Sequence, residues 1–434
     1  MLSKEQNELI TRTNADTPMG RLMRRYWLPA LLSEEIPEPD GPPAQVRILG
    51  EELVAFRDSR GRIGLLGEAC AHRGTSLFYG RNEECGLRCI YHGWKYDVDG
   101  NVVDTPAEPS GEKLEAGGEA ASQPRERREF RHKVKQVAYP THEVAGIVWA
   151  YLGPAEKKPV FPDYAFTQVP LEQTYVTKCV LECNYLQGLE GECDSAHLSF
   201  LHRQFEAKDL QALYKADGAP EYITEDTDFG VRLVALRHPS PEETYVRVSS
   251  FVMPVTCWVP AAHRTEAHIY VPIDDTHSWR YDLGFFSDSL PTPAALHRRH
   301  SIGPDYRRYR TMANHYLQDR VVQRTADFTG IEDFLNEDAC ATETMGPIYD
   351  RSREHLGQSD KGVIAVRRRL LDAIRDHEAG LEPPHILRSP ADMSHVDTFG
   401  AVIPAGRDWR QEFPHLTLAS PADRAARERL VVKS

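Results

Sequence analysis

The sequence contains no run of about 18 apolar residues, the length that a membrane-spanning helix needs. Its N-terminus, MLSKEQNELI, lacks the basic, apolar and small-residue regions of a secretory signal peptide. Positive charge is also scarce, because 52 Lys and Arg stand against 65 Asp and Glu and give a formal net charge of −13. This balance disfavours nucleic acids and anionic membranes as partners. We therefore expect no membrane and no nucleic-acid partner, and a cytoplasmic location.

Two redox motifs are missing as well. The sequence has no GxGxxG nucleotide-binding motif and no C-x4-C-x2-C run of a plant-type ferredoxin. A chain without them cannot take hydride from NADH unaided, so any electrons that it uses must come from a separate reductase. The cysteines show no disulfide-like spacing, which is typical of a reducing compartment.

Two short Cys/His pairs lie near the start of the chain. They are Cys70-Ala-His72 and Cys89-Ile-Tyr-His92, separated by sixteen residues. Two thiolates can ligate one iron of a [2Fe–2S] cluster while two imidazoles ligate the other, which is the Rieske arrangement. A structural zinc site uses the same residue types, but zinc fingers usually pair Cys with Cys and His with His. The spacing therefore predicts a one-electron Rieske cluster, with zinc as the alternative. The remaining cysteines fit no second cluster motif: Cys85, Cys179, Cys183, Cys193, Cys257 and Cys340.

The apolar pattern changes along the first third of the chain. Residues 5–35 have the spacing of helix and turn, and from about residue 44 the runs become those of short strands. Asp99-Gly100 is a strong hairpin signal, so the Cys/His pairs are expected in loops between strands. Residues 107–133 are rich in Gly, Ala, Glu and Arg without an apolar period and predict an exposed insertion. The Pro-rich stretch 154–170 predicts a linker.

The rest of the sequence predicts an α+β domain. Four strand-like segments between residues 228 and 286 favour an antiparallel sheet, and helical patterns follow at about 292–327 and 361–378. A chain of 434 residues allows about two to three domains. The expected division is an N-terminal helical segment 1–43, a cluster domain 44–153 containing the 107–133 insertion, and a larger domain 154–434.

A second metal motif lies just beyond the linker. Asp194, His197 and His202 form D-x2-H-x4-H, and two imidazoles with one carboxylate make the facial triad of non-haem Fe(II) oxygenases. The chain has 18 His, so a pair five residues apart can also arise by chance. On an ideal α-helix His197 and His202 would point about 140° apart. A shared metal ion therefore predicts a π-bulge or a helix break between them.

The two motifs carry a resemblance to a known family. The segment from Cys70 to Gly100 resembles the Rieske domain of aromatic-ring oxygenases, with their HRG and YHGW neighbourhoods. Respiratory-chain Rieske proteins carry two further cysteines at the positions where this chain has Thr75 and Tyr91. This difference disfavours the respiratory-chain branch. The resemblance to the phthalate-dioxygenase branch extends over most of the chain, including NELITRTNADTPMGRLMRRYWLPALL and MGPIYDRSREHLGQSDKGVIAVRRRLL. It implies an N-terminal all-β Rieske domain and a C-terminal catalytic domain of the helix-grip (START-like) type.

The resemblance also implies residue roles. Asp194 matches a carboxylate that bridges to a cluster His on a neighbouring subunit, and His197 and His202 match two ligands of a mononuclear Fe(II). The carboxylate ligand of that iron is placed at Asp338, in FLNEDACATETMGPIYDRS. The competing carboxylates are Asp333 and Glu343. Many family members have Asn four residues before the bridging Asp, where this chain has Glu190, so any role of that Asn does not transfer.

The family resemblance implies a terminal oxygenase that activates O2 with electrons from an NADH-dependent flavin and ferredoxin-type reductase. It also implies a homotrimer or a larger homo-oligomer. An aromatic carboxylate is the expected substrate, undergoing phthalate-like ring cis-dihydroxylation, with oxidative O-demethylation of a methoxylated aromatic acid as the alternative. A non-catalytic Rieske electron carrier is the hypothesis from another class. Arg203 and Arg247 are candidates for pairing with the substrate carboxylate, and surface solvation is the alternative for either.

Overall fold

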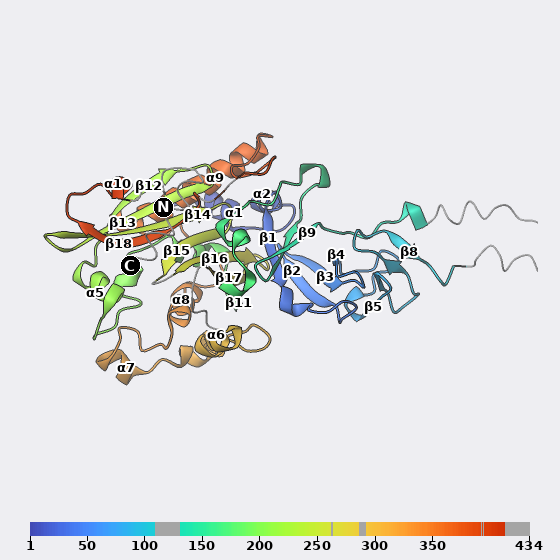
Figure 1. Cartoon of the computed structure of the whole chain (residues 1–434), viewed down its shortest axis with the longest axis horizontal. Coiled ribbons are helices and arrows are strands. Elements are labelled where there is room, and N and C mark those ends of the chain that lie inside the picture. Colours follow the sequence, from blue (N-terminus) through green and yellow to red (C-terminus); the bar gives the residue numbers. More distant parts are fainter. Residues whose placement is uncertain (109–130, 262–263, 286–291, 392, 394, 413–434) are drawn as a thin grey trace, which may run out of the picture. The chain divides into compact units, whose positions relative to one another are not determined.

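The computed structural model describes the chain in two compact units (Figure 1). One unit is Trp27–Pro154, and the other combines Met1–Tyr26 with Ala155–Ser434. The sequence places the first boundary after residue 43, whereas the structure places it after Tyr26. Residues outside the description are 109–130, 262–263, 286–291, 392, 394 and 413–434, so most of the predicted 107–133 insertion lies outside the described residues.

The first unit begins with a strand where helix and turn are predicted. β1 (Trp27–Leu32) pairs antiparallel with β10 (Ile147–Tyr151), which pairs with β9 (Thr141–Val144). The prediction of helix and turn as far as residue 35 is wrong here because Pro29 lies in the middle of the apolar segment. A proline cannot donate the hydrogen bond that a helix interior requires.

Two further sheets complete the first unit, and both are antiparallel. The first contains β2 (Ala44–Ile48), β3 (Glu51–Arg57) and β4 (Ile63–Gly67). The second contains β5 (Arg81–Glu83), β6 (Gly86–Arg88), β7 (Lys95–Tyr96) and β8 (Val102–Asp104). The predicted hairpin is confirmed, and Gly100 adopts a φ of 79° in its turn. The Cys/His pairs lie in the loops that follow β4 and β6, as predicted.

The second unit is built on an eight-stranded sheet in the order β11-β17-β16-β15-β14-β13-β12, with β18 paired to β14. All of its pairings are antiparallel, which confirms the predicted sheet. The strands are β11 (Thr174–Leu181), β12 (Glu221–Asp226), β13 (Gly230–Ser240), β14 (Glu243–Val252), β15 (Thr256–Ala261), β16 (Arg264–Pro272), β17 (Ser278–Phe285) and β18 (Phe399–Pro404).

The second unit also contains α-helices (Figure 1). They are α1 (Lys4–Thr11), α2 (Pro18–Met23), α4 (Tyr185–Glu192), α5 (Asp209–Ala216), α6 (Pro293–Arg299), α7 (Arg320–Thr325), α8 (Phe334–Glu343), α9 (Lys361–Glu378) and α10 (Trp409–Glu412). The predicted helix at 361–378 is confirmed as α9. The predicted long helix at 292–327 is wrong, because Gly303-Pro304 interrupts the pattern and leaves only α6, α7 and a kinked 3-10 segment.

One face of the sheet carries the functional elements. Phe251, Cys257, His268, Asp282 and Thr177 lie opposite one another across five neighbouring strands and therefore share a face. Helix α4 packs against β15 and β16, and α8 packs against α4. The close approach depends on Gly188 of α4, because a Cβ there would lie 2.3 Å from the ring of Tyr270. This packing brings α4 and α8 together beside the sheet.

The N-terminal helices belong to the second unit. Helices α1 and α2 pack against α9, and α1 also contacts α4. The Asn7 side chain donates to the carbonyl of Tyr349 at 3.0 Å, and the Tyr185 hydroxyl donates to the carbonyl of Ile10 at 2.8 Å. Residues near the N-terminus and residues near 349, far apart in the sequence, are therefore held together in this unit. None of the helices in the described part has the length and apolar content to span a bilayer.

Candidate metal centres

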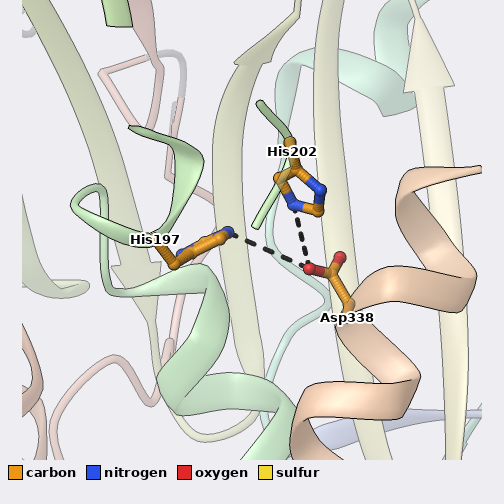
Figure 2. A group of neighbouring side chains, drawn as sticks. All are labelled: His197, His202 and Asp338. Atoms are coloured by element: carbon orange, nitrogen blue, oxygen red, sulfur yellow. Dashed lines mark ion pairs between the residues drawn. The ribbon is translucent and has the colours of Figure 1, made fainter. Parts of the chain in front are cut away.

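His197, His202 and Asp338 converge in the second unit (Figure 2). One ligand atom from each lies within 4.8 Å of the others. Oδ1 of Asp338 lies 3.0 Å from Nε2 of His202 and 3.9 Å from Nε2 of His197. His197 begins a short 3-10 turn (His197–Ser199) that ends at the non-helical Phe200, so the predicted helix break between His197 and His202 is confirmed. Two imidazole nitrogens and one carboxylate oxygen at this spacing are a donor set that suits a divalent transition metal.

A carboxylate holds the other ring nitrogen of His202. Nδ1 of His202 donates to Oε2 of Glu337 at 2.7 Å, and the Thr329 hydroxyl donates to the same carboxyl group. Burial alone would lower the pKa of His202, but Asp338 and Glu337 raise it to about 10. The contact to Glu337 fixes the ring so that Nε2 faces Asp338, as in many metal-binding histidines. The sequence analysis missed Glu337, although it directly precedes Asp338.

Asp194 lies beside His197 in a similar way. Its Oδ2 is 3.7 Å from Nδ1 of His197, a buried atom without a hydrogen-bond partner in the described residues. Oδ1 accepts from the N–H of Ala196 at 2.7 Å and from the hydroxyl of Tyr222 at 3.1 Å. Burial would raise the pKa of Asp194, but His197 and these donors hold it below its ordinary value. Asp194 is therefore a carboxylate turned toward the outer nitrogen of His197.

The competing carboxylates are engaged elsewhere. Asp333 accepts from Nδ1 of His300 at 2.7 Å, and the buried Glu343 binds Arg308 and the hydroxyl of Tyr316. The group of ligand atoms contains Asp338 and neither competitor. Within the described chain, the geometry thus agrees with the placement of the third ligand at Asp338.

Glu190 has buried ionic partners on two sides. Its carboxylate accepts from Arg351 at 2.8 Å and from Arg367 at 2.6 Å. Burial would raise the pKa of Glu190, but the two guanidinium groups hold it below its ordinary value. These contacts tie α4 to α9 and to the segment that follows α8.

The two Cys/His loops share one backbone pattern. In each, the cysteine N–H donates to the carbonyl five residues later, at 2.9 Å for Cys70 and 2.8 Å for Cys89. The N–H of the glycine four residues after each cysteine donates back to the cysteine carbonyl, at 2.8 Å for Gly74 and 3.0 Å for Gly93. Both glycines have a positive φ, 77° and 74°, which other residues rarely adopt. Two matching turns therefore present the two cysteines.

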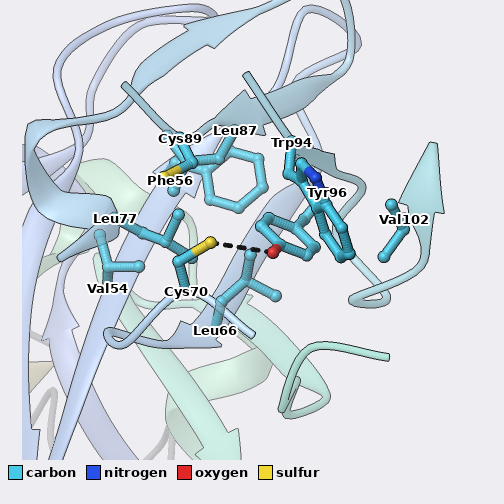
Figure 3. Packing of buried hydrophobic residues seen from close by; sticks show 10 residues of the cluster. All are labelled: Val54, Phe56, Leu66, Cys70, Leu77, Leu87, Cys89, Trp94, Tyr96 and Val102. Carbon is cyan, nitrogen blue, oxygen red and sulfur yellow. Dashed lines mark hydrogen bonds between the residues drawn. The ribbon is translucent and has the colours of Figure 1, made fainter. Parts of the chain in front are cut away.

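The side chains of these loops form a donor set for a [2Fe–2S] cluster. Cys70 and Cys89 are buried in the core of the unit (Figure 3), where the hydroxyl of Tyr96 lies 3.0 Å from Sγ of Cys70. The rings of His72 and His92 are 4.6 Å apart, and Nδ1 of His92 is buried without a hydrogen-bond partner in the described residues. Buried thiols beside half-buried imidazoles fit a cluster with two sulfur and two nitrogen ligands.

The candidate substrate arginines make no ion pair within the described residues. The guanidinium of Arg203 lies over the ring of Phe200 at 5.9 Å. Nη1 of Arg247 donates to the carbonyl of Pro260 at 3.0 Å, on a half-buried side chain. Arg280 is a buried arginine that the sequence analysis missed, and it contacts Asp338 at 3.3 Å. The signal for it was the charged residues at alternate positions in the otherwise apolar strands β16 and β17.

Comparison with known proteins identifies both units. A profile described as "Rieske [2Fe-2S] domain" matches residues 26–123, and one described as "LigXa C-terminal domain like" matches residues 150–425. The phthalate 4,5-dioxygenase oxygenase subunit of Pseudomonas putida is 40% identical over 94% of both chains. The chain belongs to the Rieske aromatic-ring oxygenases, as an alpha subunit. Membership sets aside the structural-zinc and electron-carrier hypotheses, because this family carries a Rieske [2Fe–2S] cluster and is enzymatic.

Further relatives of this oxygenase differ in substrate. The 3-chlorobenzoate-3,4-dioxygenase oxygenase subunit of Comamonas testosteroni is 34% identical and covers 95% of this chain and 98% of its own. The 5,5'-dehydrodivanillate O-demethylase oxygenase subunit of Sphingobium sp. is 31% identical, with 90% and 85% covered. The crystal structure of dicamba monooxygenase has the same fold, with a TM-score of 0.57 at 17% identity over 82% of this chain and 99% of that one. As the oxygenase subunit of a multicomponent system, the protein requires a reductase partner.

Proposed function

We propose that this oxygenase hydroxylates an aromatic carboxylate by phthalate-like ring cis-dihydroxylation. The convergence of three ligand atoms in a chain that also contains a Rieske domain carries the proposal. The proposed ligands of the mononuclear iron are His197, His202 and Asp338. The proposed ligands of the cluster are Cys70, His72, Cys89 and His92.

The two centres have complementary chemistry. When bound, a Rieske cluster supplies single electrons, and a ferrous ion with open coordination positions activates O2. The protein prepares the iron site by turning Nε2 of both histidines toward Asp338. Glu337 holds the outer nitrogen of His202, and Asp194 faces that of His197. The hydrogen bond to Glu337 fixes the ring of His202 before metal and substrate bind, and the carboxylate of Asp194 lies beside the ring of His197.

We propose that Asp194 also joins subunits. About a quarter of its side chain (25%) is exposed, so its carboxylate can accept a further N–H from a cluster imidazole of a neighbouring subunit. Such a head-to-tail contact is heterologous and closes naturally into a ring, which we propose to be a homotrimer or a larger assembly. Its electrons would come from an NADH-dependent flavin and ferredoxin-type reductase. The free thiols of the chain fit a cytoplasmic location.

The proposed substrate class is supported by the substrates named for two relatives and by two arginines that can pair with a carboxylate. Phthalate and 3-chlorobenzoate, named for two relatives, are aromatic carboxylates. Arg203 and Arg247 have no carboxylate partner in the described chain and can pair with such an acid. Arg280 cannot serve, because three carboxylates already surround its guanidinium. Arg247 is the stronger candidate, because its half-buried side chain lies on the face of the sheet that carries α4.

Metal and product analysis tests the proposal. Anaerobically reconstituted protein should contain about three irons and about two acid-labile sulfides per chain. About two irons per chain without turnover would contradict the proposal. With reductase and O2, a screen of phthalates, chlorobenzoates and methoxylated aromatic acids should yield a cis-diol. Release of formaldehyde would favour the alternative function, oxidative O-demethylation, which the O-demethylase among the relatives supports.

The substrate arginine has a separate test. Replacing Arg247 by Met should raise the KM for the acid substrate far more than the KM for its methyl ester, because only the acid carries the charge that pairs with arginine. Arg203→Met provides the parallel variant. An equal effect on acid and ester would reject the residue as the carboxylate anchor.

A further inference from the structure

A buried network of charges lies directly behind Asp338. Its centre is Arg280 of β17, whose side chain is 1% exposed. Nε of Arg280 donates to Asp282 at 2.8 Å, Nη2 lies 3.3 Å from Glu192, and Nη1 donates to Oδ2 of Asp338 at 3.3 Å. One guanidinium therefore joins the sheet, the end of α4 and the proposed iron ligand on α8.

Contacts of Glu192 and Tyr270 help to hold Arg280 in place. Glu192 accepts from the hydroxyl of Tyr270 at 2.6 Å and contacts Nδ1 of His268 at 2.9 Å. The guanidinium itself lies over the ring of Tyr270, with 5.7 Å to its centroid. Three carboxylates contact this guanidinium fork, so Arg280 cannot turn away without losing its hydrogen bonds to Asp282 and Asp338.

The two oxygens of Asp338 are divided between two tasks. Oδ2 faces Arg280, whereas Oδ1 faces the Nε2 atoms of His202 and His197. Without Arg280 the carboxylate could rotate, because the described residues provide no other contact to Oδ2. The division leaves one defined oxygen for the metal.

The buried charges around Arg280 also support a metal ion at Asp338. Glu192, Glu266, Asp282 and Asp338 are buried or largely buried carboxylates, and Arg280 and His268 are the cations among them. Burial would lower the pKa of His268, but Glu192 and Asp282 raise it well above its ordinary value. The carboxylates of this network therefore outnumber its cations, and a divalent cation at Asp338 would reduce the imbalance. Uncompensated buried charge is costly, so the network favours a filled metal site.

We propose that Arg280 is a positioning residue of the mononuclear metal site, which orients Asp338 toward the two histidines while Asp282 and Glu192 fix its own position. The inference rests on the proposed iron ligands. It adds a residue that acts on metal binding through Asp338 and does not touch the substrate.

Metal titration of the holoprotein tests this role. The mononuclear metal is removed by chelation with the Rieske cluster retained, and Co(II) is titrated calorimetrically. Arg280→Gln should weaken Co(II) binding by about 10- to 100-fold, the usual loss when a group that orients a metal ligand is removed. Arg280→Lys should lose less, because lysine keeps the charge but lacks the planar fork. The absorption of the cluster reports that each variant is folded.

Arg351→Lys is the matched control for Arg280→Lys. Arg351 is also fully buried and binds Glu190, two residues from Glu192, but it does not contact Asp338. Its replacement should leave Co(II) affinity unchanged. Wild-type affinity in Arg280→Gln, or the same loss in Arg351→Lys as in Arg280→Lys, would overturn the inference.

Two further variants keep the test decisive. If Arg280→Gln does not fold, Asp282→Asn loosens the guanidinium while keeping Arg280 and Asp338, and wild-type affinity in that variant overturns the inference. His202→Ala separates the inference from the proposed function. If His202→Ala binds Co(II) like the wild type, the proposed iron site itself is wrong, whatever the Arg280 variants show.

Discussion

Removing one hydroxyl beside the proposed cluster should lower its reduction potential. The hydroxyl of Tyr96 lies 3.0 Å from Sγ of Cys70, and both side chains are buried. When Cys70 ligates iron it is a thiolate, so the hydroxyl is the donor. Reduction adds negative charge to the cluster, and a donor to its sulfur therefore stabilises the reduced state more than the oxidised state. Tyr96→Phe removes this preference without removing the ring from the core.

The size of the shift follows from the value of one hydrogen bond. A net contribution of about 0.5–1.5 kcal/mol is typical of an intramolecular hydrogen bond. For one electron a tenfold change in equilibrium corresponds to about 59 mV, or about 1.4 kcal/mol. If the difference between the two redox states is of this order, Tyr96→Phe lowers the potential by about 20–65 mV.

A redox titration followed by EPR or circular dichroism measures this potential. Tyr151→Phe is the control, because Tyr151 is buried in the same unit and its hydroxyl donates to the carbonyl of Pro154 at 3.2 Å. A shift below about 10 mV in Tyr96→Phe, or an equal shift in Tyr151→Phe, would refute the reasoning.

Three further predictions concern the second unit. His202→Ala should lower the iron content from about three to about two per chain and leave the Rieske EPR signal intact; unchanged iron content contradicts the ligand assignment. Tyr222→Phe should retain both centres yet slow oxidation of the reduced cluster by about 10-fold in single-turnover stopped flow, because Asp194 loses a donor; an unchanged rate argues against this role. Glu190→Gln should reduce the free energy of unfolding by about 3–5 kcal/mol at neutral pH, because it leaves buried arginine charge unpaired. Since the folded pKa of Glu190 is depressed, this difference should be complete above about pH 4.3 and vanish as the pH falls through the lower folded pKa; denaturation at several pH values measures it, and a constant difference contradicts it.

The sequence predicts the cluster loops well because their residues are close neighbours in the chain. Cys70 to His92 span a short segment whose spacing and glycines already define two turns, and the hairpin at Gly100 follows from a local signal. The errors arose where one residue overrides an apolar pattern: Pro29 converts a helical spacing into a strand, and Gly303-Pro304 divides a long helix.

The surroundings of the iron site could not be predicted in this way. Glu337 contacts His202 across 135 residues of sequence, and Arg280 reaches Asp338 across 58. Such contacts depend on the order of strands in the sheet, which no local spacing encodes. Asp338 itself was placed by family resemblance, because its helix contains other carboxylates at similar positions.

Because α1 and α2 pack in the second unit, they cannot complete their folding until late in synthesis of the chain. Their packing partner α9 leaves the ribosome more than three hundred residues later, whereas the cluster unit Trp27–Pro154 can fold soon after its own synthesis. Until α9 has been synthesised, the apolar side of the N-terminal helices therefore has no native contacts with it. Capture of these helices by chaperones during translation is the expected consequence.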